Sequence, residues 1–465
     1  MDANNKDRLE KLGERPVGRL LWEYSVPAVV GMLVMALYNV VDRIFIGQWV
    51  GPDAIAGLAV TFPIMNLATA IGVLVGVGSS SRVSIVLGAG DRPHAELILG
   101  NAFTLTMVNA AIYILVFTVF IDPMLHAFGA SDVTAPYGRE YMLALMPGLL
   151  LTNIAFGFNN IMRASGYPKK AMATMLLGAV VNVVLDPLFI KVFDMGILGA
   201  AIATDIAMAA SAWFVMWHFM RPDVSLRFRR GTFRLDWGVI VSIVSIGAAP
   251  ALVNAASCAV NAIVNRSLAE WGGDRAIGAA GIMVTFTSLL VTVVLGICQG
   301  MQPIVGYNYG ARKFHRLKRA YWLAVAAATV VTVVGQLVGT IIPSAVARAF
   351  TTDADLIAAS DYALRTCLVW FWAVGFQIIS TAFFQSIGKA GKSIFLSLSR
   401  QVIFLIPLLL WLPGEFGLLG VWVSFPLSDV VATIATAALM MWQFRHLGIG
   451  NEELGMRSEE LGMRG

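Results

Sequence analysis

Charged residues are scarce in this sequence. Only 13% of its 465 residues are charged and 58% are hydrophobic, whereas a soluble domain has about 25% charged and 45–50% apolar residues. The mean hydropathy is +0.76. These values exclude a soluble domain and predict an all-α integral membrane protein with many spans, whose main partner is the lipid bilayer.

Cysteines and enzyme motifs are also few. Cys258, Cys298 and Cys367 lie in apolar segments without CxxC spacing, which argues against a disulfide framework or a zinc site. No HExxH or GxSxG motif occurs. Residues 386–393 resemble a Walker A loop, but Ser386 replaces the first glycine and the stretch joins two apolar segments instead of a strand and a helix. We therefore expect no enzyme, no catalytic residue and no cofactor other than a coupling ion.

Apolar runs of the length of a membrane span recur along the whole chain. They predict about twelve transmembrane helices, near residues 20–48, 54–81, 97–121, 135–160, 168–192, 197–220, 238–264, 276–303, 316–344, 357–386, 391–412 and 418–444. The net charge of +5 comes from lysines and arginines in short connections. That pattern indicates membrane topology and gives no reason to expect nucleic-acid binding.

The basic residues recur on alternate connections, for example around residues 163–170, 221–234, 312–319 and 389–400. By the positive-inside rule these connections and both termini are cytoplasmic. Residues 1–19 form a polar segment without a cleavage signal. Residues 445–465 contain a short duplication, Glu452–Arg457 repeated at Glu459–Arg464, and are predicted to be a solvated, disordered tail.

The two halves of the chain resemble each other at a spacing of about 222–223 residues. Pro27 corresponds to Pro250, Trp49-Val50-Gly51 to Trp271-Gly272-Gly273, and Ser165–Lys170 to Ile387–Lys392. The repeat predicts two bundles of six helices, an N-lobe over 20–220 and a C-lobe over 238–444, joined by a cytoplasmic linker over 221–237. A parallel repeat of this kind is typical of transporters whose halves rock about a central site.

Two acids inside predicted spans of the first half have no acidic counterpart at the corresponding positions of the second half: Asp42 corresponds to Asn265, and Asp186 to Ile406. An acid at this depth usually faces a cavity and marks an ion or substrate path. Asn182 precedes Asp186 by one helical turn, and Pro187 should bend the helix beside the acid. Thr204 lies at a similar depth, roughly 9–11 Å below the outer edge. We expect one site for a proton or a cation, Na+ included, at Asp42, Asn182, Asp186 and Thr204.

Each of these residues also has a plainer interpretation. Asn182 and Thr204 could simply bond neighbouring helices, and Asp205 could be a second acid of the network or a packing residue. Asp429 is the only acid well inside a C-half span. Asn159, Asn160 and Arg163 favour anchoring at the inner interface. A substrate cavity could be lined by the tyrosines and by methionines, which adapt to varied partners, and its candidate residues are Tyr38, Tyr141, Asn159, Asp205, Met65 and Met283.

Several motifs together resemble the MATE family of multidrug and toxic compound extrusion transporters, in its MepA-like bacterial branch. They are the stretch Pro27–Gly47, the stretch Asn182–Pro187, Gln299–Gly310 with the sequence Gln-Gly-Met-Gln-Pro-Ile-Val-Gly-Tyr-Asn-Tyr-Gly, and Arg400–Phe404. The resemblance covers nearly the whole chain. It departs from NorM-type members, which carry acids on helices 7 and 10, because helix 7 here offers Asn254, Asn261 and Asn265 instead.

The resemblance implies export of amphipathic, often cationic drugs in exchange for protons or sodium, through two lobes that open alternately inward and outward. It also implies that Asp42, Asn182, Asp186 and Thr204 bind the coupling ion. Small-molecule drugs would be the substrates, and the protein is expected to be a monomer. An alternative is a flippase for lipids or lipid-linked precursors, which related two-lobed exporters move. A passive channel is disfavoured by the asymmetric acids.

Overall fold

The computed structural model describes residues 10–229 and 231–462, and these residues form helices and no strand. The first half contains α2 (Val17–Trp49), α3 (Pro52–Gly88), α4 (Arg92–Ala127), α5 (Ala135–Ala164), α6 (Pro168–Pro187), the π turn η1 (Leu188–Val192) and α7 (Gly196–Met220). The second half begins with α8 (Trp237–Gly310) and α9 (Phe314–Ile341). It continues with α10 (Pro343–Arg348), α11 (Ala354–Cys367), η2 (Phe371–Ala373), α12 (Val374–Ser386), α13 (Ala390–Leu398), η3 (Ser399–Leu405), α14 (Ile406–Phe416) and α15 (Leu418–Gly462).

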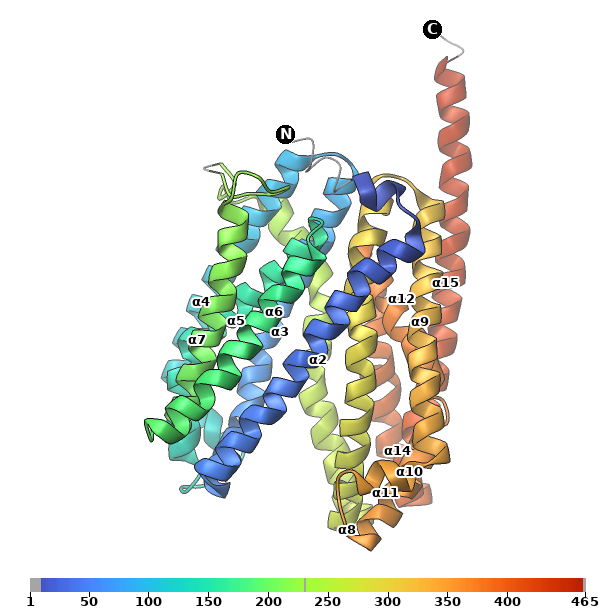
Figure 1. The fold of residues 1–465 in the computed structure, drawn as a ribbon. Helices are drawn as coiled ribbons and strands as arrows, with labels where there is room; N and C mark the ends of the chain where they lie inside the picture. Colours follow the sequence, from blue (N-terminus) through green and yellow to red (C-terminus); the bar gives the residue numbers. More distant parts are fainter. Residues whose placement is uncertain (1–9, 230, 463–465) are drawn as a thin grey trace.

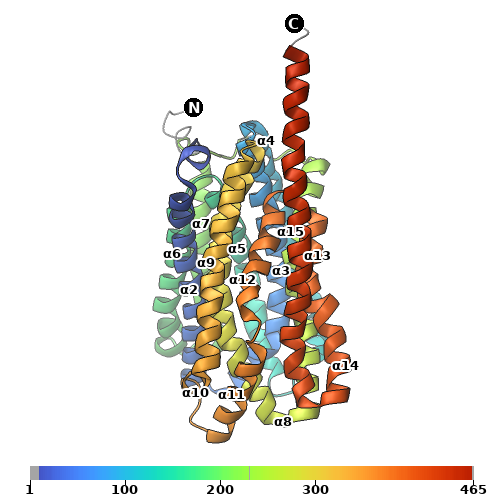
Figure 2. The same ribbon diagram turned by 90° about the vertical axis from the view of Figure 1, so that its right-hand side faces the viewer.

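The helices form two bundles that lie side by side (Figure 1). Helices α2–α7 make the N-lobe and α8–α15 the C-lobe. Both ends of the described chain lie at the same end of the molecule, which we call the terminal end; the other is the distal end (Figures 1 and 2). The lobes lie close together at the terminal end and diverge toward the distal end (Figure 1). That the terminal end faces the cytoplasm remains a prediction from the basic residues.

The number of spans agrees with the predicted fold class. Ten helices in the described chain are long and apolar enough to cross a membrane, and α11 with the segment Phe371–Ser386, bent by 59°, forms one more. Helix α8 has 74 residues, which would extend for about 110 Å. Gly273, with φ +62°, breaks it into two arms, residues 237–272 and 274–310. With the arms counted separately the chain has about twelve spans.

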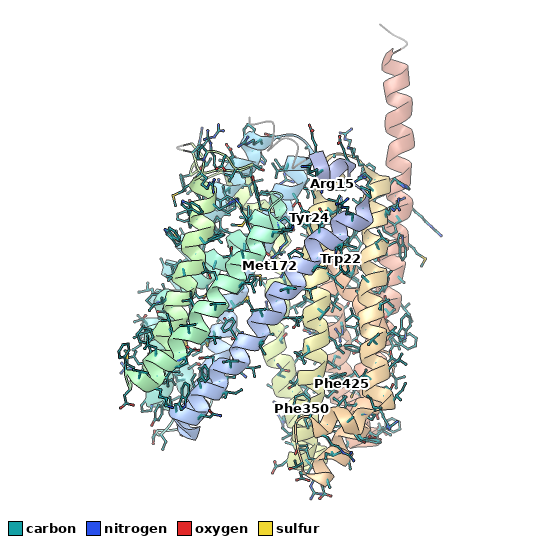
Figure 3. All side chains as sticks on the ribbon, viewed as in Figure 1. Arg15, Trp22, Tyr24, Met172, Phe350 and Phe425 are labelled. Atoms are coloured by element: carbon teal, nitrogen blue, oxygen red, sulfur yellow. The ribbon has the colours of Figure 1, made fainter. Side chains whose placement is uncertain are left out.

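Large apolar side chains cover the outside of the molecule, as expected where lipid replaces water. Trp22 is 72% exposed and Leu410 is 71% exposed. Figure 3 labels Trp22 near the terminal end of α2 and Phe350 at the distal end of the C-lobe. Such exposure would be a liability in water, and it fits a protein whose surface is solvated by acyl chains.

Helix α15 continues as far as Gly462 and projects beyond the C-lobe (Figure 2), and the disorder expected for the tail stays a prediction.

One sequence prediction is wrong. Arg400, assigned to a basic connection, instead lies in η3 inside the span Ala390–Phe416. Its guanidinium pairs with the buried carboxylate of Asp429 at 2.7 Å. Because arginine carries its charge on a long stem, the partner acid can hold it within the helix bundle.

The lobes meet through close backbone contacts between α3 and α8. A Cβ atom on Gly78 would lie 2.0 Å from the carbonyl oxygen of Ile243, and one on Gly247 would lie 1.8 Å from that of Leu74. Glycine is therefore required at both positions for the helices to approach this closely. Further contacts join Ser25 to Gly300 and Val29 to Gly296. All of them lie in the half of the molecule that contains the terminal end.

We predict that Gly247→Leu separates α3 from α8 and destabilises the protein by about 1–3 kcal/mol, the usual cost of overpacking. The melting temperature of the purified protein in detergent micelles should fall by several degrees. Gly281→Leu, on the same helix with nothing within 4 Å of its Cβ position, is the matched control and should not lower it. Equal melting temperatures for the two variants would contradict the interpretation of this contact.

Candidate functional site

The acids of the first half meet at the contact between α2 and α6. Asp42 lies on α2, and Asp186 lies in the last turn of α6, immediately before Pro187. The two carboxyl groups are within hydrogen-bond distance of each other. Asp186 is completely buried. Two ionised carboxylates this close repel each other, so the pair favours a proton or a cation between them.

Asn182 joins this pair to a third helix. Its Nδ2 donates to Oδ1 of Asp186 at 3.2 Å and to Oγ1 of Thr204, on α7, at 3.3 Å. Asn182 is completely buried. The structure therefore brings together Asp42, Asn182, Asp186 and Thr204, and the assignment of an ion to them remains a prediction.

Several oxygens of the cluster accept no hydrogen bond. Within the described chain, Oδ1 of Asp42, Oδ1 of Asn182 and Oδ2 of Asp186 are buried and have no donor. Buried acceptors left in this state destabilise a fold unless a proton, ion or water satisfies them. The described residues contain no group of three or more acidic, histidine or cysteine side chains that could hold a metal ion. Two carboxylates, an amide oxygen and a hydroxyl fit a proton or a hard monovalent cation such as Na+.

The helix is interrupted beside the acids. Helix α6 ends at Pro187, and the π turn η1 follows directly. Proline removes a backbone donor and crowds the preceding turn, and π turns often occur at functional sites. In the C-lobe the π turn η3 ends before Pro407 instead of following it. The predicted bend at Pro187 is thus a local change of helix type that lies beside a carboxylate in one lobe only.

Tyr38, Tyr141 and Asp205 surround the cluster. Tyr38 is within electrostatic range of Asp42 and Asp186. Tyr141 is 3% exposed and within range of all three acids. The carboxylate of Asp205 packs against Gly148 on α5, where a Cβ atom would be 1.8 Å from its Oδ1. Asp205 is thus held by the backbone of a neighbouring helix and lies at the edge of the cluster.

A small pocket lies among α2, α5, α6 and α7. It is mainly apolar and contains three methionines. Its lining residues are Met35, Tyr38, Ala155, Phe156, Asn159, Thr174, Met175, Gly178, Ala179, Met208 and Ser211. We call it the methionine pocket. Tyr38 belongs both to this pocket and to the surroundings of the acids, so the two adjoin.

Of the residues predicted for a substrate cavity, Tyr38 and Asn159 line the methionine pocket. Tyr141 and Asp205 do not line it. Met65 packs in the distal core of the N-lobe and accepts a hydrogen bond from Thr61. Met283 is buried in the core of the C-lobe. The methionines that do line the pocket could not be selected from sequence, because a methionine on a packed face and one on a pocket face look alike.

Arg163 lies deeper than its predicted role as an interface anchor requires. The side chain is 3% exposed, and its Nη1 donates across the lobe boundary to Oε1 of Gln299 at 2.6 Å. Its Nη2 donates to Oδ1 of Asn159 at 2.8 Å. The sequence drew attention to the motif that begins at Gln299, but it gave no indication that Gln299 contacts Arg163.

The acid of the C-lobe has a different environment. Asp429 is 4% exposed and forms an ion pair with Arg400, while its backbone oxygen accepts from Nε2 of Gln377 at 2.8 Å. On helix α8, Asn261 and Asn265 are exposed. Within the described residues, the C-lobe therefore has a compensated acid where the N-lobe has an uncompensated pair.

Known proteins are similar to this chain over both halves. The MatE family model matches residues 27–188 and 250–411. The multidrug export protein MepA of Staphylococcus aureus is 24% identical over 448 residues, covering 96% of this chain and 99% of MepA. A Shewanella oneidensis protein called FAD transporter is 26% identical over 441 residues, covering 92% and 95%. A solved structure described as the outward-facing conformation of a multidrug resistance MATE family transporter superposes with a TM-score of 0.89 at 25% identity, covering 94% of this chain and 98% of that one.

We predict that Thr204→Val removes the acceptor that links α7 to Asn182 and destabilises the protein by about 0.6 kcal/mol, the average for hydrogen bonds between membrane helices. Thr204→Ser keeps the hydroxyl and should melt close to wild type. The melting temperature in detergent micelles distinguishes the two variants. A Thr204→Val variant that melts like wild type, with Thr204→Ser melting lower, would show that the methyl group and not the hydroxyl stabilises this contact.

The ion pair of the C-lobe gives a further prediction. Arg400→Gln leaves the carboxylate of Asp429 buried without a counter-charge. It should destabilise the protein by up to about 3 kcal/mol, below the usual range for broken buried pairs because Arg400 is partly exposed. The double variant Arg400→Gln/Asp429→Asn should recover most of the lost melting temperature. No recovery would show that the two side chains are not coupled.

Proposed function

The chain belongs to the MatE family, and on that basis we propose that it is a secondary active multidrug exporter. It exports amphipathic, often cationic compounds by antiport with protons or sodium ions. Energy comes from the ion gradient, because the sequence offers no ATP-binding loop. The substrate and the ion are handled in the N-lobe, and the two lobes open alternately toward either side of the membrane.

This proposal rests on one observation: the acid cluster and the methionine pocket adjoin each other. Helices α2, α6 and α7 contribute to both, and Tyr38 adjoins both. A change in the charge or position of the Asp42–Asp186 pair therefore acts on the helices that line the pocket. Methionine side chains adapt to ligands of different shape, as a multidrug pocket requires.

The coupling follows from the two carboxylates. When neither carries a proton or Na+, their charges repel, and a cationic compound nearby is stabilised electrostatically. When a proton or Na+ binds between them, that attraction weakens and α6 can change its geometry at Pro187. An ion entering from outside would thus lower the affinity for the drug there and reset the N-lobe. Since a ligand shifts a conformational equilibrium only by its difference in affinity for the two states, this antagonism is what antiport requires.

The packing of the lobes supports alternating access. The backbone contacts between lobes lie in the half toward the terminal end, and the solved structure described as outward-facing has the same fold. If the terminal end is cytoplasmic, the present arrangement is open to the outside. Release of the α3–α8 contacts would then open the inner side.

Family membership alone does not restrict the substrate to cations, since the Shewanella relative is called an FAD transporter. We base the preference for cations on the acids of this chain. A lipid flippase, the alternative from sequence, would be expected to have a strongly basic central cavity. The methionine pocket has no basic lining residue.

We predict that Asp186→Asn abolishes ethidium efflux from membrane vesicles, because the carboxylate that exchanges ion for drug is lost. Efflux should be measured with a pH gradient alone and then with a sodium gradient alone, in wild type and variant. The gradient that drives wild-type efflux identifies the coupling ion. Asp42→Asn should behave in the same way.

The control is Asp122→Asn, which removes an exposed acid that pairs with Arg139 and should leave efflux unchanged. Variant proteins must reach the membrane in wild-type amounts. Full efflux by both Asp42→Asn and Asp186→Asn would refute the proposed ion site. Failure of the wild type to move ethidium under either gradient would favour the lipid alternative.

A further inference from the structure

The buried guanidinium of Arg163 lies between the lobes, outside the acid cluster. All of its hydrogen bonds among the described residues go to neutral oxygens: Oε1 of Gln299 at 2.6 Å, Oδ1 of Asn159 at 2.8 Å and Oδ1 of Asn160 at 3.3 Å. None of the ion pairs found in the described chain includes Arg163. A fully buried cation therefore has only neutral partners.

Two buried acids outside the acid cluster have basic partners. Asp429 pairs with Arg400, and Glu96, which is 4% exposed, pairs with Arg92 at 3.2 Å and Arg229 at 3.0 Å. Removing a charge from water is costly unless an opposite charge compensates it. Against this background, the isolation of Arg163 indicates a site whose counter-charge comes from outside the chain.

The charge has no counterpart in the second half of the repeat. At the repeat spacing of 222 residues, Arg163 corresponds to Gln385. In the C-lobe, Gln385 accepts from Nε2 of Gln302, within its own lobe, at 3.2 Å. Arg163 instead reaches across the lobe boundary, so the cation and its position are peculiar to the N-lobe.

A small polar pocket lies next to the guanidinium. It is lined by Ser80, Ser84, Asn160, Arg163, Ala164, Gln299, Gln302 and Pro303. Three of these residues carry side-chain amides, and none of them is acidic. Guanidinium groups bind carboxylates and phosphates through two parallel hydrogen bonds.

We propose that this pocket between the lobes binds a carboxylate or phosphate group. The incoming oxygens replace neutral acceptors of Arg163, with the side-chain amide of Asn160 as an additional donor. Asn159 contacts Arg163 and also lines the methionine pocket. An amphipathic anion can therefore place its apolar part among the methionines and its charge on Arg163. The inference deepens the proposed function by adding anionic compounds to the substrates.

The test is binding of 5-carboxyfluorescein to the purified full-length protein in maltoside micelles without phospholipid, followed by fluorescence anisotropy. We expect Arg163→Gln to weaken binding by about 10- to 100-fold, the range for a lost hydrogen bond to a charged group. Arg163→Lys, which keeps the charge, should lose less. Arg445→Gln, which removes an exposed positive charge, should bind like wild type.

A second variant separates this role from a purely structural link between the lobes. Gln299→Leu removes the partner across the boundary but keeps the cation, and it should retain binding of carboxyfluorescein. If Gln299→Leu loses binding as severely as Arg163→Gln, Arg163 is a structural link and the proposal is wrong. Unchanged binding by Arg163→Gln, or no binding by wild type, would also overturn it.

Competition identifies the natural source of the anion. Displacement of carboxyfluorescein by phenyl phosphate supports a soluble compound. Displacement only by dihexanoylphosphatidylglycerol supports a lipid headgroup at the same site. Ethidium binding, measured on each variant, should be unaffected by Arg163→Gln. Ethidium efflux tests the proposed function separately, so Arg163-dependent anion binding without efflux would refute the exporter and leave this site standing.

Discussion

A polar group buried inside a membrane protein has no bulk water to bond with, and this constraint accounts for most of the internal arrangement of the chain. In the C-lobe it is met within the protein, because Arg400 and Asp429 neutralise each other between η3 and α15. In the N-lobe it is not fully met. Asp42 and Asp186 face each other, and three oxygens of their cluster accept no hydrogen bond in the described chain. The buried acid of the C-lobe has a counter-charge within the protein, whereas the acid pair of the N-lobe has none among the described residues.

The contact between the lobes complements this asymmetry. Glycines on α3 and α8 bring the backbones together without interdigitating side chains. An interface of this kind depends on close approach, so a small displacement removes much of its dispersion energy. Within α8, Gly273 separates the first arm, which contacts Leu74 of α3, from the second arm, which contacts Ser25 and Val29 of α2. The fold therefore has a localised contact that can be released while each lobe keeps its own core.

The features predicted well from sequence were those that depend on regular position along a helix. Span lengths follow from apolar runs, and the meeting of Asn182 with Asp186 follows from a separation of one turn. Thr204 was predicted only from its depth below the outer edge of the membrane. Residues at equal depth on neighbouring helices lie at the same level, even where the helices run in opposite directions. The predictions that failed are those that depend on how each helix is rotated about its own axis, because this rotation decides which neighbours a side chain faces. Arg400 was assigned to a loop because its partner lies 29 residues away on another helix, and Met283 was assigned to a cavity although it faces a core. The contact of Arg163 with Gln299 was missed for the same reason.

The repeat explains how such different chemistry fits one architecture. Duplication gives each lobe a proline and a π turn in its fifth helix, but the acid adjoins the proline only at Asp186, and the second copy has Ile406. The interruption leaves backbone groups to be satisfied locally in either lobe. Only in the N-lobe does it also lie beside a group whose charge can change. A change of ionisation there alters the electrostatics at the weakest point of the helix, whereas η3 experiences a fixed ion pair. Under the proposed function, movement driven by the ion is therefore expected in the N-lobe, with the C-lobe as the surface against which it moves.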